Sequence, residues 1–176
     1  MIGGIRSRLV AYEALLAEAP GVEAMEKLFQ RLDGILFCIK DREGCYLSAN
    51  DAFLQRARVE DPCDLIGRTP REFFPPLLAA GYEQQDADVI ARGEETRDRL
   101  EMITNPDGGV GWYLSDKIPI RNRRGHVIGI ASMSRDLHSS SDNDPRYAKL
   151  ATVIEHMRAH YDKPLRIGRL VTRTNL

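Results

Sequence analysis

The sequence predicts an α+β fold, with a five-stranded antiparallel sheet and helices on one face. Two observations support this prediction. Short runs typical of strands occur as a pair within residues 35–48 and as a group of three within residues 96–133. Between these groups, residues 50–92 show the apolar spacing of helices, so helices connect the two groups of strands.

Two helices are predicted before the first strand. Residues 4–18 place apolar side chains on one helical stripe, and the Pro-Gly pair at residues 20 and 21 ends this helix. Residues 22–32 repeat the pattern up to the Asp-Gly pair at residues 33 and 34. An isolated helix with a single apolar stripe is marginally stable. We therefore expect the first helix, within residues 1–20, to pair with its counterpart in a second chain.

The strands are predicted at residues 35–40, 45–48, 96–103, 110–120 and 127–133. Turn-forming residues at 41–44, 105–109 and 122–125 join them into hairpins. Between the two groups of strands, Asn50 is placed to cap a short helix that continues to Ala57. Further helical turns are predicted at residues 61–66 and 70–74. A longer helix spans residues 76–92, and Gly93 ends it.

Composition limits the class of protein. The chain has 176 residues, 43% of them hydrophobic, which is enough for one core of ordinary domain size. Its formal net charge of −1 gives no overall basic signal for nucleic acid. Three cysteines without paired spacing favour a reducing compartment over a disulfide framework. No run approaches the ~18 apolar residues of a membrane span. We expect a cytoplasmic protein.

Four segments, taken in order, resemble the PAS family of sensor domains. They are residues 33–53, the Leu-Ile-Gly-Arg-Thr run at 65–69, the Phe-Phe-Pro run at 73–75, and residues 107–137 with their Asp-Gly turn and Arg-Asp-Leu exit. The resemblance implies a sensor domain over residues 21–138, with a pocket between the sheet and the longer helix. The residues expected around that pocket are Phe37, Ile39, Asn50, Phe53, Phe74, Leu78, Tyr82, Leu100, Met102, Leu114 and Met133.

Each of these residues also has a simpler interpretation. Apolar alternation indicates burial and not a ligand, so each of these side chains is expected in a packed core more often than against a ligand. Asn50 is expected to cap the following helix more often than to bind a ligand. Trp112 lies in a predicted strand, where a position on the sheet face is commoner than stacking on a ligand.

The usual cofactors of such sensors are disfavoured by missing residues. Residues 50–100 contain no histidine that could serve as the axial ligand of haem. The Asn-Cys-Arg segment of a cysteinyl-flavin sensor is absent. Cys38 and Cys45 lie in apolar strand runs and are expected to be buried fillers rather than redox sensors. His156 and His160 share a helix face but lack a third ligand nearby, so no metal site is predicted.

No catalytic motif is present. The chain lacks a nucleophile elbow, a phosphate-binding loop and a zinc-protease helix. Asp86 and Asp88 are expected on the solvated face of the longer helix rather than as an acid–base pair. The sequence therefore predicts that the protein is not an enzyme.

The C-terminal residues carry a second resemblance. Residues 139–145 read as a linker, and residues 142–176 hold seven Lys/Arg against four Asp/Glu. Residues 154–170 then resemble the start of an AraC-type helix-turn-helix domain, which implies DNA binding by the complete regulator and not by this segment alone. The resemblance makes Arg158, Arg166, Arg169 and Arg173 candidates for phosphate contacts.

Two hypotheses follow. In the first, a homodimeric regulator senses a small molecule or partner and passes the signal through Arg135 and Asp136 to the DNA-binding region. In the second, the PAS-like domain is a dimerisation module without a ligand, and its own side chains fill its cavity. Bound mass or colour in the purified protein would distinguish the two.

Overall fold

A computed structural model describes residues 2–105 and 109–137. The chain divides into two compact units, residues 1–136 and 137–176. The second unit lies outside the described residues except for Leu137. The predicted linker and the predicted AraC-type segment therefore fall outside them as well.

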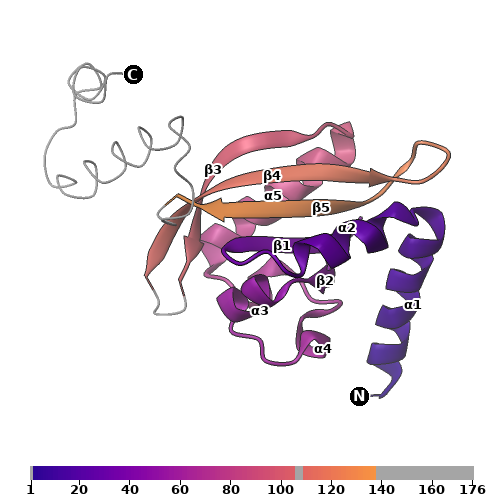
Figure 1. Ribbon diagram of the computed structural model, residues 1–176, viewed down its shortest axis with the longest axis horizontal. Coiled ribbons are helices and arrows are strands. Elements are labelled where there is room, and N and C mark those ends of the chain that lie inside the picture. The colour runs from indigo at the N-terminus through magenta and orange to yellow at the C-terminus, as the bar shows by residue number, and fades with distance from the viewer. Residues whose placement is uncertain (1, 106–108, 138–176) are drawn as a thin grey trace, which may run out of the picture. The chain divides into compact units, whose positions relative to one another are not determined.

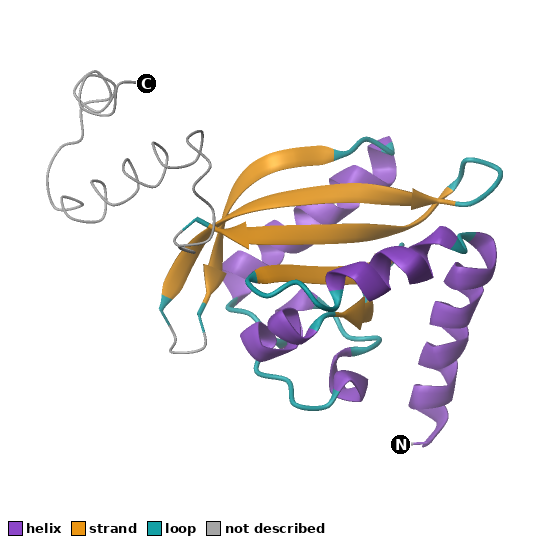
Figure 2. Cartoon of the chain, viewed as in Figure 1, coloured by secondary structure: helices purple, strands orange, loops and turns teal. Residues whose placement is uncertain are grey.

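A five-stranded antiparallel sheet forms the centre of the first unit, as the sequence predicted (Figures 1 and 2). Its strands, in the spatial order β2-β1-β5-β4-β3, are β1 (Ile35–Asp41), β2 (Tyr46–Ala49), β3 (Thr96–Thr104), β4 (Val110–Arg121) and β5 (Val127–Asp136). The first and last strands of the domain, β1 and β5, lie side by side at the middle of the sheet. β5 continues three residues beyond its predicted end at Met133 because Ile35 and Leu36 of β1 pair with Arg135 and Ser134.

Helices cover both faces of this sheet. Those between β2 and β3 are α3 (Asp51–Ala57), α4 (Pro62–Leu65), the short 3₁₀ helix η1 (Pro70–Glu72) and α5 (Pro76–Arg92). Those that precede β1 are α1 (Ile2–Glu18) and α2 (Gly21–Phe29). Figure 1 shows α5 behind the strands and α2 in front of β1. The predicted layer of helices on one face is therefore present, and α1 and α2 add a partial layer on the other.

Local signals start and stop the helices as predicted. The Asn50 side chain caps α3 by accepting a hydrogen bond from the backbone N–H of Phe53. Asp61 caps α4 in the same way. Gly93 ends α5 with a φ of 66°, a left-handed conformation that glycine adopts without strain.

Each face of the sheet has its own hydrophobic cluster. On one face, Leu36 and Cys38 of β1 pack with α3, α4 and α5. On the other, Phe37 and Ile39 of the same strand pack with α1 and α2. The stacked rings of Phe29 and Phe37, 4.5 Å apart, join α2 to this second cluster. Because β1 is buried on both faces, alternate residues along it belong to different cores.

Candidate ligand-binding cavity

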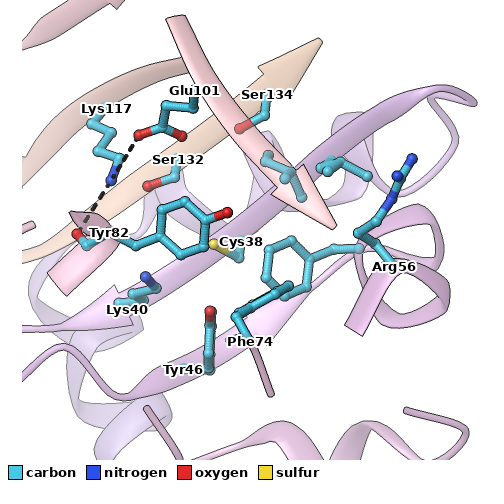
Figure 3. Close-up of a pocket in the computed structure, with 13 residues that line it drawn as sticks. Cys38, Lys40, Tyr46, Arg56, Phe74, Tyr82, Glu101, Lys117, Ser132 and Ser134 are labelled. Carbon is cyan, nitrogen blue, oxygen red and sulfur yellow. Dashed lines mark hydrogen bonds and ion pairs between the residues drawn. The ribbon is translucent and has the colours of Figure 1, made fainter. Parts of the chain in front are cut away.

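A cavity of about 40 Å³ lies between the sheet and the helices α3 and α5 (Figure 3). A single buried water needs roughly 10–15 Å³, so the space exceeds that of one water. All five strands and both helices contribute to its wall, together with Phe74 from the segment that precedes α5. The lining residues are Leu36, Cys38, Lys40, Tyr46, Phe53, Arg56, Phe74, Tyr82, Glu101, Ile103, Lys117, Ser132 and Ser134.

Three of the residues expected around the pocket lie at this cavity, namely Phe53, Phe74 and Tyr82. Their rings meet edge to face, with centroids 6.2 Å apart for Phe53 and Phe74 and 5.5 Å apart for Phe74 and Tyr82. The aromatic rings thus form one continuous apolar wall.

The other expected residues lie elsewhere. Phe37 and Ile39 face α1 and α2. Leu100 and Met102 are exposed, with 38% and 40% of their surface accessible. The remaining members of the expected set, also absent from the lining, are Leu78, Leu114 and Met133.

The physical reason is the two-residue repeat of a strand. The apolar residues chosen from β1, β3, β4 and β5 share one face of the sheet, because Leu100 pairs with Leu114 and Phe37 pairs with Met133. The cavity lies on the opposite face, where polar residues alternate with them. The strand residues predicted from apolar alternation therefore lie on the face of the sheet opposite the cavity.

Asn50 has a structural role in the described residues. Its side-chain oxygen accepts hydrogen bonds from the backbone N–H groups of Phe37 and Phe53, each 3.0 Å long. Its amide nitrogen donates to the backbone carbonyls of Ile35 at 2.8 Å and Phe29 at 3.2 Å. The side chain is 1% exposed and has used both of its polar atoms, so it ties β1, α2 and α3 together.

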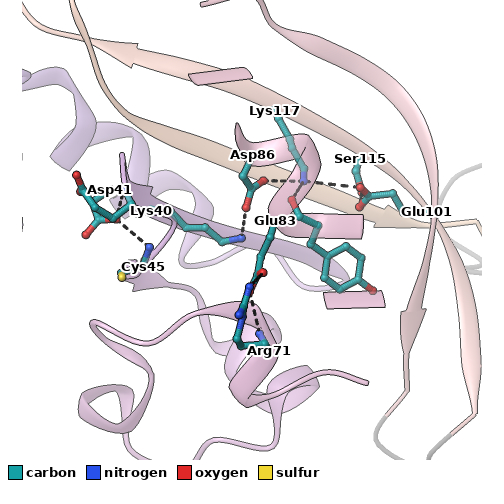
Figure 4. Close-up of polar contacts among 11 residues, drawn as sticks. Lys40, Asp41, Cys45, Arg71, Glu83, Asp86, Glu101, Ser115 and Lys117 are labelled. Carbon is teal, nitrogen blue, oxygen red and sulfur yellow. Dashed lines mark hydrogen bonds and ion pairs between the residues drawn. The ribbon is translucent and has the colours of Figure 1, made fainter. Parts of the chain in front are cut away.

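A cluster of buried charges borders the cavity (Figure 4). Asp86 of α5 accepts hydrogen bonds from Lys40 Nζ of β1 at 2.5 Å and from Lys117 Nζ of β4 at 2.7 Å. Lys117 Nζ also lies 3.8 Å from Glu101 of β3, whose other carboxylate oxygen accepts a 2.7 Å hydrogen bond from Ser115 Oγ. The four charged residues are each at most 6% exposed.

The prediction that Asp86 lies on a solvated helix face is wrong, because Asp86 is only 1% exposed. A signal for this was present in the sequence. Asp86 follows Tyr82 by four residues and precedes Val89 by three, which places it on the buried stripe of α5. Lys40 and Lys117 were not among the predicted site residues, and lysine side chains are seldom buried unless they are paired.

Neighbouring charges control how these groups ionise. Burial by itself would raise the pKa of the Asp86 carboxyl, but Lys40 and Lys117 lower it by more, so its pKa lies below the usual range. Burial by itself would lower the pKa of Lys40, but the neighbouring Tyr46 and Asp86 raise it above its usual value. Lys40 therefore remains charged beside an ionised Asp86.

Two polar atoms at the cavity have no hydrogen-bond partner within the described residues. They are Glu101 Oε1 and Ser132 Oγ, and both atoms are fully buried. Buried polar atoms in native proteins are nearly always paired with protein, water or a bound molecule. Water or another bound molecule at these two atoms would complete the polar side of the cavity.

Arg56 connects the cavity to the end of the last strand. It lines the cavity, hydrogen-bonds Asn105, and holds its guanidinium 5.0 Å from the centroid of the Tyr113 ring. The Tyr113 hydroxyl donates a 3.0 Å hydrogen bond to Asp136, the final residue of β5. Arg135, the other predicted exit residue, forms an ion pair with Asp98 at 3.3 Å.

Cysteine and metal chemistry find little support in residues 2–105 and 109–137. No group of three or more metal-binding side chains occurs there. Burial raises the pKa of the Cys38 thiol to about 11, which disfavours the reactive thiolate. Cys45 is half-buried and Cys63 is exposed.

None of the described helices is both long enough and apolar enough to span a membrane.

Comparison with known proteins identifies the fold family. A family model described as "PAS fold" matches residues 29–142. The chain belongs to the PAS-fold family. No curated protein matched this PAS chain.

Several solved structures resemble this PAS domain. VqmA of Vibrio cholerae, described as a dimer and as a LuxR-type receptor, is 30% identical with a TM-score of 0.56, over 65% of this chain and 50% of VqmA. A VqmA structure with ligand and DNA is 25% identical with a TM-score of 0.58, over 82% of this chain and 59% of that one. The chain thus spans only about half of the VqmA proteins it matches.

The PAS domain of BvgS from Bordetella pertussis resembles this domain in fold. The identity is 23% and the TM-score 0.57, over 78% of this chain and 98% of the BvgS domain. The PAS domain is therefore homologous to the sensor domains of transcription regulators such as VqmA, and this class is sensory rather than enzymatic.

Proposed function

We propose that this PAS domain binds a small molecule in the cavity beneath α3 and α5 and thereby controls a DNA-binding region. The observation that carries the proposal is the pair of unpartnered buried atoms, Glu101 Oε1 and Ser132 Oγ, on the wall of a cavity larger than one water. Structures of the related VqmA bound to a molecule called DPO, and bound to ligand and DNA, support it by similarity.

The ligand-free dimerisation module is the weaker alternative. It requires side chains of the protein to fill the cavity and to pair its polar groups. The aromatic wall formed by Phe53, Phe74 and Tyr82 leaves space open, and the two polar atoms have no hydrogen bond among the described residues. Both features favour a bound molecule.

The proposed output is an AraC-type DNA-binding region that begins at residues 146–176, outside the described part of the chain. Arg158, Arg166, Arg169 and Arg173 are its proposed phosphate contacts. The signal would pass from Arg56 through Tyr113 to Asp136 and so to the segment that follows β5. A ligand acts through this route only if it binds two arrangements of the domain with unequal affinity.

A homodimer is also part of the proposal. The apolar stripe of α1 is not free to form it throughout, because Leu15 is 5% exposed and packs with Tyr12 and Leu16 into the core of its own chain. The opposite end of that sheet face, over β3 and β4, is uncovered among the described residues and exposes Leu100, Met102 and Ile118. We place the proposed dimer contact there.

Three measurements test the function. Native mass spectrometry of the purified chain should detect added mass that is lost on unfolding, and a metabolite library should raise the melting temperature. Gel-shift titration of the complete regulator should show salt-sensitive binding that prefers one DNA sequence. A colourless chain with no added mass and no thermal shift would support the ligand-free module instead.

A further inference from the structure

The charges of the buried cluster that borders the cavity sum to zero. Lys40 and Lys117 supply two positive charges, while Asp86 and Glu101 supply two negative ones, and ion pairs at 2.5, 2.7 and 3.8 Å link all four. Because water has little access to these side chains, any additional ionised group would be buried without a counter-charge. The balance disfavours a charged ligand in the deep part of the cavity.

Arg56 is the one further charged residue on the described cavity wall, and its charge is already engaged. It is half-buried, bonds the Asn105 side chain, and lies against the face of the Tyr113 ring. Tyr113 in turn donates to Asp136, which brings a negative charge to the same end of the site. Arg56 therefore does not supply an unopposed positive charge for an anionic ligand.

Glu101 Oε1 forms an ion pair with Lys117 but accepts no hydrogen bond within the described residues, and this specifies the polarity of the missing hydrogen-bond partner. A carboxylate accepts hydrogen bonds and cannot donate them, so Glu101 Oε1 requires an N–H or O–H group. An anion at this point would be repelled by Glu101. A cation would lie close to Lys117, whose Nζ is 3.8 Å from the same oxygen. An uncharged donor meets neither penalty.

The remaining wall specifies the shape of the ligand. Ser132 Oγ, the second unpartnered atom, lies with Glu101 on the sheet side of the cavity, while Tyr82 and Phe74 supply rings beside them (Figure 3). The Tyr82 hydroxyl is already engaged, because it donates to the backbone carbonyl of Met102. Ser134 Oγ is engaged as well, since it shares a 2.7 Å hydrogen bond with Ser115. The site thus offers one short polar edge and an aromatic wall.

We infer that the cavity selects a small uncharged molecule that donates an N–H or O–H hydrogen bond to Glu101 Oε1 and places a second polar group against Ser132 Oγ. Glu101 is then the specificity-determining residue. The inference rests on the proposed function and names the class of ligand.

Four compounds of nearly identical shape separate charge from hydrogen bonding. Benzamide is neutral and donates, acetophenone is neutral without a donor, benzoate is an anion, and benzamidine is a cation. Binding is measured on the full chain by ¹H–¹⁵N shift titration, which detects weak complexes. We expect benzamide to bind about tenfold more tightly than each of the other three.

The Glu101→Gln variant should change this preference in a defined direction. Its amide retains a carbonyl acceptor, so benzamide affinity should stay within about threefold. Two lysines then face one carboxylate, so benzoate should bind about tenfold more tightly than it does to the wild type. Glu95→Gln is the matched control, because Glu95 is exposed and pairs with Arg97 away from the cavity. It should leave all four affinities unchanged.

The ¹H–¹⁵N spectra also report whether each variant is folded. Should Glu101→Gln unfold, Ser132→Ala provides a second test, since it removes the other unpaired atom without a change of charge. It should weaken benzamide about threefold and leave benzoate unchanged. Failure of Ser132→Ala to weaken benzamide would overturn the inference.

The outcomes separate this inference from the proposed function. A wild-type protein that binds benzoate or acetophenone as tightly as benzamide would overturn the inference alone. So would a co-purified molecule that is ionised at neutral pH or lacks an N–H or O–H group. A cavity that contains only water, with no compound bound and no retained mass, would overturn both.

Discussion

Lys117 Nζ donates a 2.7 Å hydrogen bond to Asp86 Oδ1, and the side chains of both residues are at most 5% exposed. This bond joins α5 to β4 of the sheet. Asp86 also accepts from Lys40 of β1, so one carboxylate links α5 to two strands that are separated in the sheet by β5. Stability and the shape of the cavity therefore depend on the same buried group.

Asp86→Asn should destabilise the domain strongly. The substitution leaves Lys40 and Lys117 buried with one negative charge fewer, and loss of one partner of a buried ion pair costs about 3–5 kcal/mol. Urea unfolding followed by circular dichroism measures the change. Asp88→Asn is the matched control on the same helix, because Asp88 only accepts a hydrogen bond from Gln84 at the surface. It should change the free energy of unfolding by less than about 0.5 kcal/mol. An equal effect of both variants would contradict the assignment.

The stability of the domain should fall in acid through Asp86. Its folded pKa lies below the ordinary value of 3.8, because Lys40 and Lys117 outweigh the effect of burial. The group therefore contributes stability above about pH 3.8, and this contribution is lost as the pH falls through the lower folded pKa. Lys40, whose pKa is raised from 10.5, contributes below that pH and loses its contribution only in stronger alkali.

Urea unfolding between pH 2.5 and pH 7 provides the measurement. The wild type should lose stability below about pH 4, and the Asp86→Asn variant should show a shallower slope there. Identical slopes for the two proteins would show that other carboxyl groups cause the acid transition.

Asn50→Ala should destabilise the domain by about 3 kcal/mol. It removes the cap of α3 and leaves buried backbone groups of Phe37 and Ile35 without their side-chain partner. Asp61→Ala is the matched control, since Asp61 caps the exposed α4 and should cost only about 1 kcal/mol. Chemical denaturation measures both. Equal losses would indicate that Asn50 acts as a cap alone.

Met102→Glu should shift the protein from dimer to monomer. Met102 lies on the uncovered face of β3 beside Leu100 and is 40% exposed, so a charge there would disrupt an apolar contact between two copies. Light scattering after size-exclusion chromatography measures the mass. Leu77→Glu is the control, because Leu77 is 84% exposed on α5 and should leave the mass unchanged. A dimer that persists in Met102→Glu would place the interface elsewhere.

The strands and turns were predictable because their signals are local. The turn at residues 41–44 and the glycine after α5 act within a few residues, and both occur where the sequence predicted them. Asn50 was assigned as a cap from its position before a helical run, and that assignment is confirmed. Its bonds to Phe29 and Ile35 involve residues 21 and 15 positions away, respectively, which local reasoning does not reach.

By itself, the sequence determined the α+β class, the order of strands and helices, and the PAS resemblance, since each depends on periodicity and turn residues along the chain. Only the tertiary structure decided which face of each strand meets the cavity. Alternate residues of β1 are buried under different helices, so apolar residues follow one another almost without interruption along the strand. Such a run does not show which residues face the cavity. The charges of Lys40, Asp86, Glu101 and Lys117 were equally undecided, because polar positions on strands and helices are ordinarily solvated. They become a buried, balanced cluster only when α5 packs across the sheet and brings them together.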